Sequence, residues 1–309
     1  LAEGGVDLIL LETCFDALNV KAAIYAMDKL GLDLPLAVSV SVSDRSGRTL
    51  TGQTIEAFYH SVEHGRLWAF GLNCSLGAQE LTPLVEELAS FASCRVLCYP
   101  NAGLPNEMGE YDQTPEQMAA QMRSMASRGI LNIAGGCCGT TPEHVAAIAR
   151  EISGCKPRAL RPAPENLLVL SGLEPVYVDR ERSNFTNVGE RTNVAGSRKF
   201  ARLIAAGQYD EALQIAAGQI EGGAGIIDVN MDDAMLDSAA QMRTFLRHIS
   251  SDPAVAKAAL MVDSSDWETV LQGLKNAQGK CIVNSISLKE GEEVFLMKAR
   301  EIRRLGAAM

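Results

Sequence analysis

The sequence predicts an α/β protein made of two series of parallel strands and helices. Three observations support this fold class. Short apolar runs alternate with segments of helical, 3.6-residue spacing, a proline-rich stretch interrupts this alternation, and a second alternating series follows it. Buried parallel strands read as near-continuous apolar runs separated by helical crossovers, which is the pattern of α/β folds.

The first series contains five expected strands with helices between them. The strands are residues 8–13 (LILLET), 36–42 (LAVSVSV), 69–75 (AFGLNCS), 95–101 (RVLCYPN) and 131–138 (LNIAGGCC). Helical spacing is clearest in residues 16–30 and 78–92. This alternation indicates β/α repetition rather than separate helical and sheet regions.

A proline-rich stretch separates this series from the second. Residues 157–175 hold four of the 11 prolines, and because proline fixes φ and removes a backbone donor, we predict an extended linker there. The strands expected beyond it are residues 186–191 (TNVGER), 225–231 (GIIDVNM), 259–264 (ALMVDS) and 280–287 (KCIVNSIS), with helices at 198–222, 234–249 and 267–277.

Neither series is long enough for a closed barrel. A (β/α)8 barrel needs eight strands and typically ~250 residues. The chain starts within a helical pattern (LAEGGVDLILLET) and stops just after a helix (EIRRLGAAM). Two open sheets are one interpretation, but the abrupt start favours pieces of two barrels.

Composition excludes several classes of protein. Lys and Arg number 28 against 38 Asp and Glu, a net charge of −10, and without a basic tract this argues against duplex nucleic-acid binding. No apolar run approaches the ~20 residues that cross a bilayer. Eight cysteines are few for a disulfide scaffold of this length, and two of them are adjacent. They indicate a reducing compartment, so we expect a cytoplasmic protein.

Three cysteines fall at predicted strand ends. Cys74 ends one strand, and Cys137 and Cys138 end another within GGCCGTTPE. Strand ends carry the sites of α/β folds, and the neighbouring glycines let both adjacent cysteines turn toward one point. Three thiolates suit Zn²⁺ and leave a fourth position for a substrate thiol, whose pKa the metal would lower. This combination suits alkyl transfer to sulfur.

The alternative is a set of buried free cysteines, which are common in protein cores. No regular C-x-x-C spacing supports the zinc hypothesis. Burial as free thiols is our interpretation of the five other cysteines, which are Cys14, Cys94, Cys98, Cys155 and Cys281.

Longer segments carry resemblances to two families. GLNCSLGAQE and NIAGGCCGTTPEHV resemble the zinc-dependent homocysteine methyltransferase family. NFTNVGERTNVAGSRKF, GIIDVNMDDAMLD and VDSSDWETVLQGLKNAQGKCIVNSIS resemble the pterin-binding domain family. The order of the two resembles that in cobalamin-dependent methionine synthases and covers nearly the whole chain.

The resemblance implies two linked (β/α)8 TIM-type barrels, both incomplete in this chain. Residues 1–155 would be the C-terminal part of a homocysteine-binding zinc barrel, 156–183 the interdomain linker, and 184–309 the N-terminal part of a pterin-binding barrel that takes methyltetrahydrofolate. The chain would then be an internal fragment of a larger enzyme.

The same resemblance assigns residues to the homocysteine site. Cys74, Cys137 and Cys138 match the zinc ligands. Glu12, in LLETCFD, matches a carboxylate that holds the amino group of homocysteine, and we assign Asn73 to the same substrate site. The alternatives are a solvent-facing carboxylate at a helix start for Glu12 and an amide that satisfies loop backbone for Asn73.

Polar residues at strand ends are the candidates for the pterin site. Asp263 and Asn284 lie one βα repeat apart, so we expect them on adjacent strands facing one mouth. A carboxylate and an amide can pair with the amino-pyrimidinone edge of a pterin, and the resemblance implies that both contact it. Glu190, Asp228 and Asn230 are further candidates, although Asp and Asn also end strands for structural reasons.

The resemblance implies methyl transfer from N5 of 5-methyltetrahydrofolate to cobalamin, and then to zinc-bound homocysteine, giving methionine and tetrahydrofolate. Methylcobalamin would be bound by a domain absent from this chain, which would be its protein partner, and the fragment alone would have incomplete pockets. One alternative is a zinc thiol methyltransferase with another methyl donor and a different pterin reaction. The other is a non-catalytic zinc-binding fragment whose fourth ligand is a spare cysteine such as Cys98.

Overall fold

The structure is a computed structural model that describes residues 1–179, 181 and 185–309. The chain divides into two compact units. Unit 1 comprises Leu1–Asp16, Gly31–Tyr59 and Arg66–Glu165, and unit 2 comprises Ala17–Leu30, His60–Gly65 and Asn166–Met309. The predicted boundary between linker and pterin-binding domain, at residues 183 and 184, lies outside the described residues.

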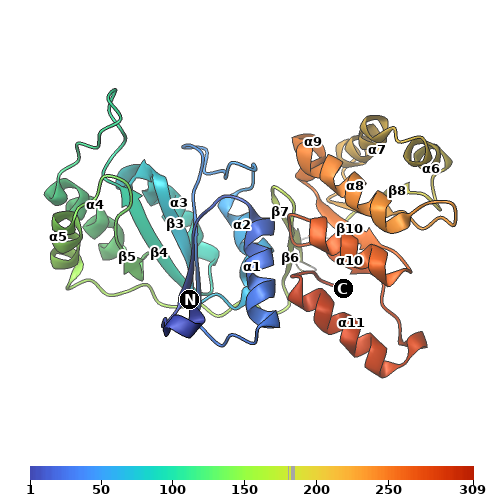
Figure 1. Cartoon of the computed structure of the whole chain (residues 1–309). Coiled ribbons are helices and arrows are strands. Elements are labelled where there is room, and N and C mark those ends of the chain that lie inside the picture. Colours follow the sequence, from blue (N-terminus) through green and yellow to red (C-terminus); the bar gives the residue numbers. More distant parts are fainter. Residues whose placement is uncertain (180, 182–184) are drawn as a thin grey trace. The chain divides into compact units, whose positions relative to one another are not determined.

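Unit 1 is built on a five-stranded parallel sheet whose strands follow in chain order, β1-β2-β3-β4-β5. The strands are β1 (Ile9–Cys14), β2 (Leu36–Val40), β3 (Ala69–Gly77), β4 (Arg95–Asn101) and β5 (Ile133–Ala134) (Figure 1). All five predicted strands are present. The last is much shorter than predicted, because the chain leaves the sheet after Ala134 and turns into a loop.

Helices connect these strands as crossovers. They are α3 (Ala78–Phe91), α4 (Pro115–Ser127) and, shared between the two units, α2 (Ile55–Val62), while α5 (Pro142–Ile152) follows the last strand. Thr114 caps α4, its hydroxyl accepting from the backbone N–H of Gln117 while the Gln117 side chain accepts from the Thr114 N–H. Such a capping box satisfies two otherwise unpaired donors at a helix start.

Arg158 anchors the segment after α5 to the rest of unit 1. Its side chain is 5% exposed and its guanidinium donates to the carbonyls of Ala89, Ala92 and Cys94, at and just beyond the C-terminal end of α3. The five N–H donors of a guanidinium suit this group of carbonyls, because the last carbonyls of a helix have no partner within the helix. The segment is therefore held in place where the sequence predicts a linker to begin.

Strand β3 lies at the centre of the sheet and is buried along most of its length. Ala69 packs with Ala37 and Leu97 in a small cluster, to which Trp68, Tyr99 and Ile133 add. Phe70 contacts the ring of Tyr59 edge-on, with centroids 5.3 Å apart. The successive side chains of this strand therefore serve different packing layers, as expected for a strand covered on both faces.

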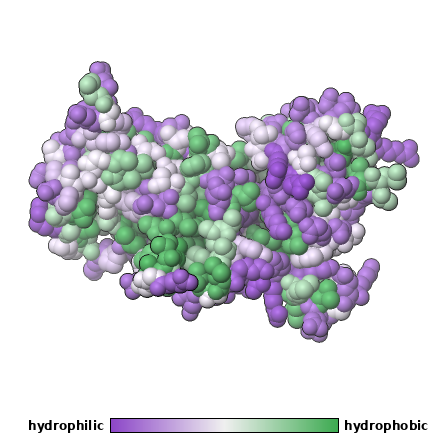
Figure 2. All heavy atoms as spheres, viewed as in Figure 1, coloured by the Kyte–Doolittle hydropathy of each residue, from purple (hydrophilic) through white to green (hydrophobic). Residues whose placement is uncertain are grey.

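Strand β1 is an edge of this sheet in the described residues. Leu8 and Leu10 are 37% and 40% exposed, and Figure 2 shows hydrophobic side chains gathered on one part of this unit's surface. An exposed apolar edge strand is prone to pair with other chains. An incomplete barrel would leave such edges, because only closure of the sheet removes them.

Unit 2 contains a four-stranded parallel sheet of order β11-β10-β9-β8. Its strands are β8 (Val188–Asn193), β9 (Ile226–Asn230), β10 (Ala259–Asp263) and β11 (Ile282–Asn284). Four strands were predicted here and four are present. Within the predicted linker the structure adds an antiparallel hairpin, β6 (Leu168–Ser171) with β7 (Pro175–Val178). A proline can begin a strand there, because its missing N–H need not pair.

The helices of unit 2 are α1 (Ala17–Lys29), α6 (Arg198–Ala205), α7 (Tyr209–Glu221), α8 (Ser238–Ser251), α9 (Pro253–Ala256), α10 (Trp267–Asn276) and α11 (Glu292–Arg304). The prediction of one helix over residues 198–222 is wrong. Gly207 has φ +69°, a left-handed conformation that ends α6. The chain turns there and begins α7.

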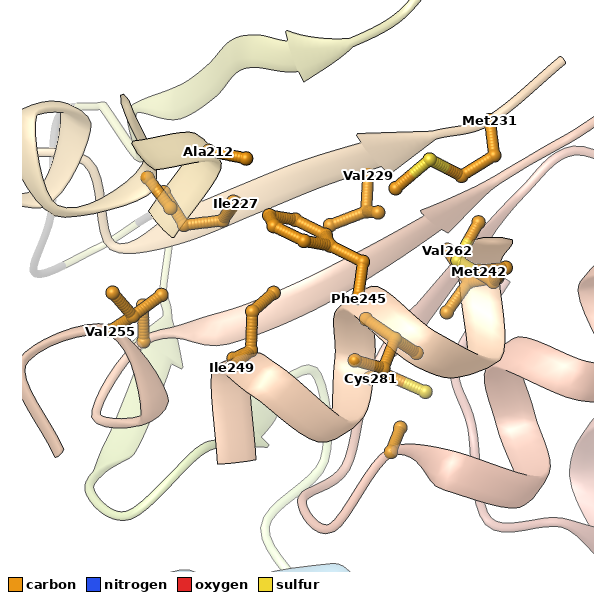
Figure 3. Close-up of a cluster of buried hydrophobic side chains, with 14 of the residues drawn as sticks. Ala212, Ile227, Val229, Met231, Met242, Phe245, Ile249, Val255, Val262 and Cys281 are labelled. Carbon is orange, nitrogen blue, oxygen red and sulfur yellow. The ribbon is translucent and has the colours of Figure 1, made fainter. Parts of the chain in front are cut away.

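The largest hydrophobic cluster of unit 2 lies between this sheet and its helices, and a smaller cluster joins Leu170, Ile226 and Ala259. Figure 3 shows Phe245 of α8 lying over Ile227 and Val229 of β9, with Met242 beside Val262 of β10. Phe245 also meets Phe200 edge-on at 5.2 Å between centroids. Apolar burial of this kind stabilises a fold by roughly 25 cal/mol per Å², so this cluster fixes the strands whose ends carry the polar candidates.

The α/β class with parallel sheets is thus confirmed. Both sheets are open in the part of the chain that is described. After α11 the chain returns to the sheet, where Ala308 bridges Ile282 of β11 in parallel. Among the described residues, no helix is both long and apolar enough to cross a membrane.

Candidate functional site

Cys74 lies in a distortion near the carboxyl end of β3. The pairing with β4 runs regularly to Asn73, opposite Tyr99, and resumes at Gly77, opposite Asn101. Cys74 to Leu76 therefore face a single residue of β4, which makes a bulge. Cys74 has φ 62°, a left-handed conformation that is uncommon outside glycine. Bulges and such backbone outliers gather at functional sites, where they redirect a side chain.

Cys137 and Cys138 lie in the loop that follows β5, whereas the sequence predicts them at the end of a strand over residues 131–138. Backbone contacts with β4 hold this loop, since Cys137 N donates to Pro100 O at 2.8 Å and Ala102 N donates to Cys138 O at 2.9 Å. Cys138 N also donates to the side-chain oxygen of Asn101 at 3.1 Å. Both cysteines are thus fixed by the strand between β3 and β5.

The three sulfur atoms meet at one point. Cys74 Sγ lies 3.6 Å from Cys138 Sγ, Cys137 Sγ lies 4.0 Å from Cys138 Sγ, and all three lie within 4.8 Å of one another. Tetrahedral zinc with Zn–S bonds of about 2.3 Å separates its sulfurs by about 3.8 Å. Soft thiolate donors at this spacing fit Zn²⁺, and no other group of three metal-ligating side chains occurs among the described residues.

The remaining cysteines lie outside this group. Cys94, Cys98 and Cys281 are buried as expected, whereas Cys14 and Cys155 are only partly buried, so burial was the wrong expectation for these two. Burial raises the pKa of Cys98 to about 12, which makes it a poor metal ligand. A fourth cysteine ligand is therefore not found among the described residues.

Glu12 is exposed on β1. Burial raises the pKa of Tyr99 to about 12, and the charges of Glu12 and Cys137 act in the same direction, so this ring lies within electrostatic reach of both. Glu12 and Cys137 thus both lie close enough to Tyr99 to influence its pKa. Asn73, by contrast, is fully buried and donates to Cys137 Sγ at 3.7 Å.

Tyr111 is a neighbour of the thiols that the sequence pattern did not indicate. Asn101 Nδ2 donates to its hydroxyl at 3.5 Å. Burial raises the pKa of Tyr111, and the adjacent Cys138 raises it further. The residue lies in the irregular segment between β4 and α4, which has no periodicity from which it could be found.

In unit 2 the strand ends place four polar residues in one row. Asn193 of β8 pairs in register with Asn230 of β9, Asn230 with Asp263 of β10, and Asp263 with Asn284 of β11. Residues in register on parallel strands face the same side of a sheet. Asp263 and Asn284 therefore lie on adjacent strands as expected, and Asn193 is an additional member of the row.

Asp228 lies beneath this row, opposite a second bulge. Between the pairs of Gly189 with Ile227 and of Thr192 with Val229, β8 sets Glu190 and Arg191 against Asp228 alone. Asp228 is buried, and its Oδ1 has no hydrogen-bond partner among the described residues. A buried acceptor without a partner is costly, which is a reason to expect a donor from a ligand there.

The carboxylates of this group influence one another. Burial raises the pKa of Asp228 to about 6, with further contributions from the charges of Asp263 and Glu190. The pKa of Asp263 is also raised, again chiefly by burial. Amide donors oppose these effects, since Asn230 Nδ2 donates to Asp263 Oδ2 at 3.0 Å and Asn193 Nδ2 donates to Asp228 Oδ2 at 3.3 Å.

A neighbouring loop is organised by Asp232, which the sequence pattern also did not indicate. One carboxylate oxygen accepts from Ser264 Oγ at 2.5 Å, and the other accepts from the N and Oγ of Ser265 at 2.8 and 2.9 Å. These bonds fix the turn that follows β10, directly after Asp263. Acidic side chains in loops often have such a structural role.

Comparison with protein families gives two matches, one for each half of the chain. Residues 1–152 match the family Homocysteine S-methyltransferase, and residues 189–309 match the family Pterin binding enzyme. The chain thus carries a homocysteine S-methyltransferase domain followed by a pterin-binding domain, and domains of both families normally form TIM barrels. This order is the arrangement of methionine synthase-type enzymes, and it implies homocysteine and a folate-type pterin as ligands.

Proposed function

Because the chain joins a homocysteine S-methyltransferase domain to a pterin-binding domain, we propose that it serves methionine synthesis, with 5-methyltetrahydrofolate as methyl donor and homocysteine as acceptor. The observation that carries this proposal is the convergence of three cysteine sulfurs within 4.8 Å of one another, from the bulge in β3 and the loop after β5. Three sulfurs leave room for a fourth, which the thiol of homocysteine would supply.

Cys74, Cys137 and Cys138 would hold the zinc. When bound, the metal lowers the pKa of a substrate thiol and keeps it as a nucleophilic thiolate at neutral pH. The role of the chain is to fix the ligand directions, which it does through the bulge in β3 and the loop held on β4. Glu12 would bind the ammonium group of homocysteine, so that the substrate sulfur points to the cysteines.

The pterin would lie on the row of polar strand ends in unit 2. Asp263 and Asn284 offer a carboxylate and an amide for its amino-pyrimidinone edge, with Asn230 orienting Asp263 through the bond between them. Asp228, whose Oδ1 is unpartnered, would accept an N–H of the ligand. Glu190 would complete the group from the bulge in β8.

The methyl group must pass between two ligands held by different domains. The resemblance predicts cobalamin as its carrier, bound outside this chain. Each transfer is a displacement at a methyl carbon, so the chain supplies alignment and desolvation rather than several acid and base groups.

Zinc analysis of the purified chain tests the homocysteine half of the proposal. Wild type should hold one zinc, and X-ray absorption should show an additional sulfur ligand when homocysteine is added. Cys138→Ser should lose the metal, whereas Cys155→Ser, which changes a cysteine outside the group, should keep it. A folded wild-type chain without zinc would overturn this half of the proposal, and four sulfur ligands without homocysteine would favour the non-catalytic zinc-binding alternative.

Ligand titration tests the pterin half. Methyltetrahydrofolate should bind to wild type and to Asp237→Asn, which changes a helix cap, but weakly to Asp263→Asn. Methionine formation from methylcobalamin and homocysteine then distinguishes the cobalamin route from another methyl donor. Turnover only with a different methylated compound would favour the other thiol methyltransferases.

A further inference from the structure

Asn73 sits at the meeting point of two irregular strands and one thiol. It is fully buried and directly precedes Cys74 at the start of the bulge in β3. Strand β1 has a bulge of its own, where Glu12 and Thr13 face Ser39 of β2 alone, and Thr13 has φ 56°. The Asn73 side chain lies between these two distortions and contacts Thr13, Ser39 and Cys137.

The hydrogen bonds of Asn73 fix which way its amide points. Its Oδ1 accepts from the hydroxyl of Ser39 and from the backbone N–H of Thr13, the latter at 3.3 Å. Its Nδ2 donates to Thr13 Oγ1 at 2.8 Å and to Cys137 Sγ at 3.7 Å. A backbone N–H can only donate, so a flipped amide would set two donors against each other. The N–H groups must therefore face the sulfur.

We propose that Asn73 is a positioning residue that supplies an N–H···S hydrogen bond to Cys137 and thereby sets the direction and charge of one of the three thiolates. The inference rests on the proposed function, since it concerns those sulfurs as zinc ligands. Groups that hydrogen-bond to metal ligands orient them and tune the metal, and losing them typically lowers metal affinity 10- to 100-fold.

The position of Asn73 connects two of the three cysteines. Its side chain directs Cys137, while its own backbone leads into Cys74, so two ligands from distant parts of the chain share one buried anchor. The bond also withdraws electron density from the Cys137 sulfur. Cys138, which is exposed, receives no amide donor from Asn73. Among the three sulfurs, the Asn73 amide thus donates to that of Cys137.

Cobalt substitution tests the proposal, because the sulfur-to-Co²⁺ charge-transfer band reports on the donor strength of each thiolate. Asn73→Asp keeps the shape and both acceptor roles but cannot donate to sulfur. We expect Co²⁺ and Zn²⁺ to bind this variant about 10- to 100-fold more weakly, and the band to move to lower energy. The negative charge of the introduced carboxylate would by itself attract the metal ion and strengthen binding. Weaker metal binding by this variant would therefore be due to the lost N–H donor.

Ser41→Ala is the matched control. Ser41 directly follows β2, and its hydroxyl lies 2.7 Å from that of Ser75, the residue after Cys74. No bond from the Ser41 hydroxyl to a sulfur is found in the described part of the chain. We expect wild-type affinity and an unshifted band. A shift of equal size in Ser41→Ala would mean that any loss of strand-to-strand bonding produces it, and this would overturn the proposal.

A measurement on the unmodified chain decides the matter if Asn73→Asp does not fold. In protein loaded with ¹¹³Cd²⁺ and labelled with ¹⁵N at asparagine side chains, the Asn73 amide proton should show scalar coupling to the metal through Cys137. Absence of this coupling in a chain that binds ¹¹³Cd²⁺ overturns the positioning role and leaves the proposed function standing. A folded chain that binds none of these metals overturns both.

Discussion

Replacing Asp228 with asparagine should stabilise unit 2 at neutral pH while it removes a proposed pterin contact. Asp228 is 3% exposed and one of its oxygens has no partner in the described residues. Burial, then the charge of Asp263, raises its pKa from 3.8 to about 6. The folded protein therefore keeps a proton between pH 4 and 6 that the unfolded chain has lost, so stability falls as the pH rises through this window.

The size of this effect follows from the shift in pKa. A change of roughly two units, at about 1.36 kcal/mol each, gives about 3 kcal/mol between the protonated and ionised limits. Wild type should thus lose about 2 to 3 kcal/mol of unfolding free energy between pH 4 and pH 7.5 through this group, and Asp228→Asn should not. The variant can still accept the bond from Asn193 through its amide oxygen.

Urea unfolding followed by circular dichroism measures this difference. The two pH values lie on either side of the isoelectric point of about 5.0. The chain carries a net positive charge at pH 4 and a net negative charge at pH 7.5, so at both values it aggregates less than at its isoelectric point. The variant should be the more stable protein at pH 7.5 and nearly equal to wild type at pH 4. Equal stabilities at pH 7.5, or a difference that does not change with pH, would refute the reasoning. Methyltetrahydrofolate should bind the variant about 10- to 100-fold more weakly, the value of a hydrogen bond to a charged group.

Three further predictions concern unit 1. Arg158→Met should lower the free energy of unfolding by about 2 to 4 kcal/mol in thermal melts, because several buried carbonyls lose their donor, and an unchanged melting temperature would show that water replaces it. Gly71→Ala should give insoluble or strongly destabilised protein, since its Cβ would lie 1.8 Å from a carbonyl oxygen of β4, whereas Gly4→Ala, with nothing within 4 Å, should melt as wild type. In metal-free protein at pH 7.5, iodoacetamide should label the exposed Cys138 and leave Cys98 unmodified, as peptide mass spectrometry can establish; rapid labelling of Cys98 would contradict its burial.

The strands were predictable because each is a short apolar run, and hydrophobic periodicity responds to burial. All nine predicted strands lie within a few residues of strands in the structure. The errors occur where the local pattern carries no such signal. Helical spacing continues across residues 198–222, and only the backbone conformation of Gly207 reveals the break. The hairpin β6–β7 was not predicted, because the prolines around it indicate an extended linker.

The candidate sites show a similar division. The sequence places Cys74 and Asp263 at strand ends because strands end where apolar runs end. It does not show that bulges occur beside both sites, in β1 and β3 of unit 1 and in β8 of unit 2. A bulge adds one or more residues without altering composition, so periodicity cannot detect it. Asn193 was missed for this reason, since the bulge shifts it into the row formed by the other strand ends.

The two sites also differ in how their polar groups are satisfied, and this difference follows from what each would bind. In unit 1 the buried amide of Asn73 is fully bonded, which suits a rigid frame around a metal. In unit 2 Asp228 keeps an unpartnered oxygen and a raised pKa, which costs stability until a ligand donates to it. A methyl donor that must bind and leave in every cycle suits such a site, because ligand binding then relieves a cost already present in the fold.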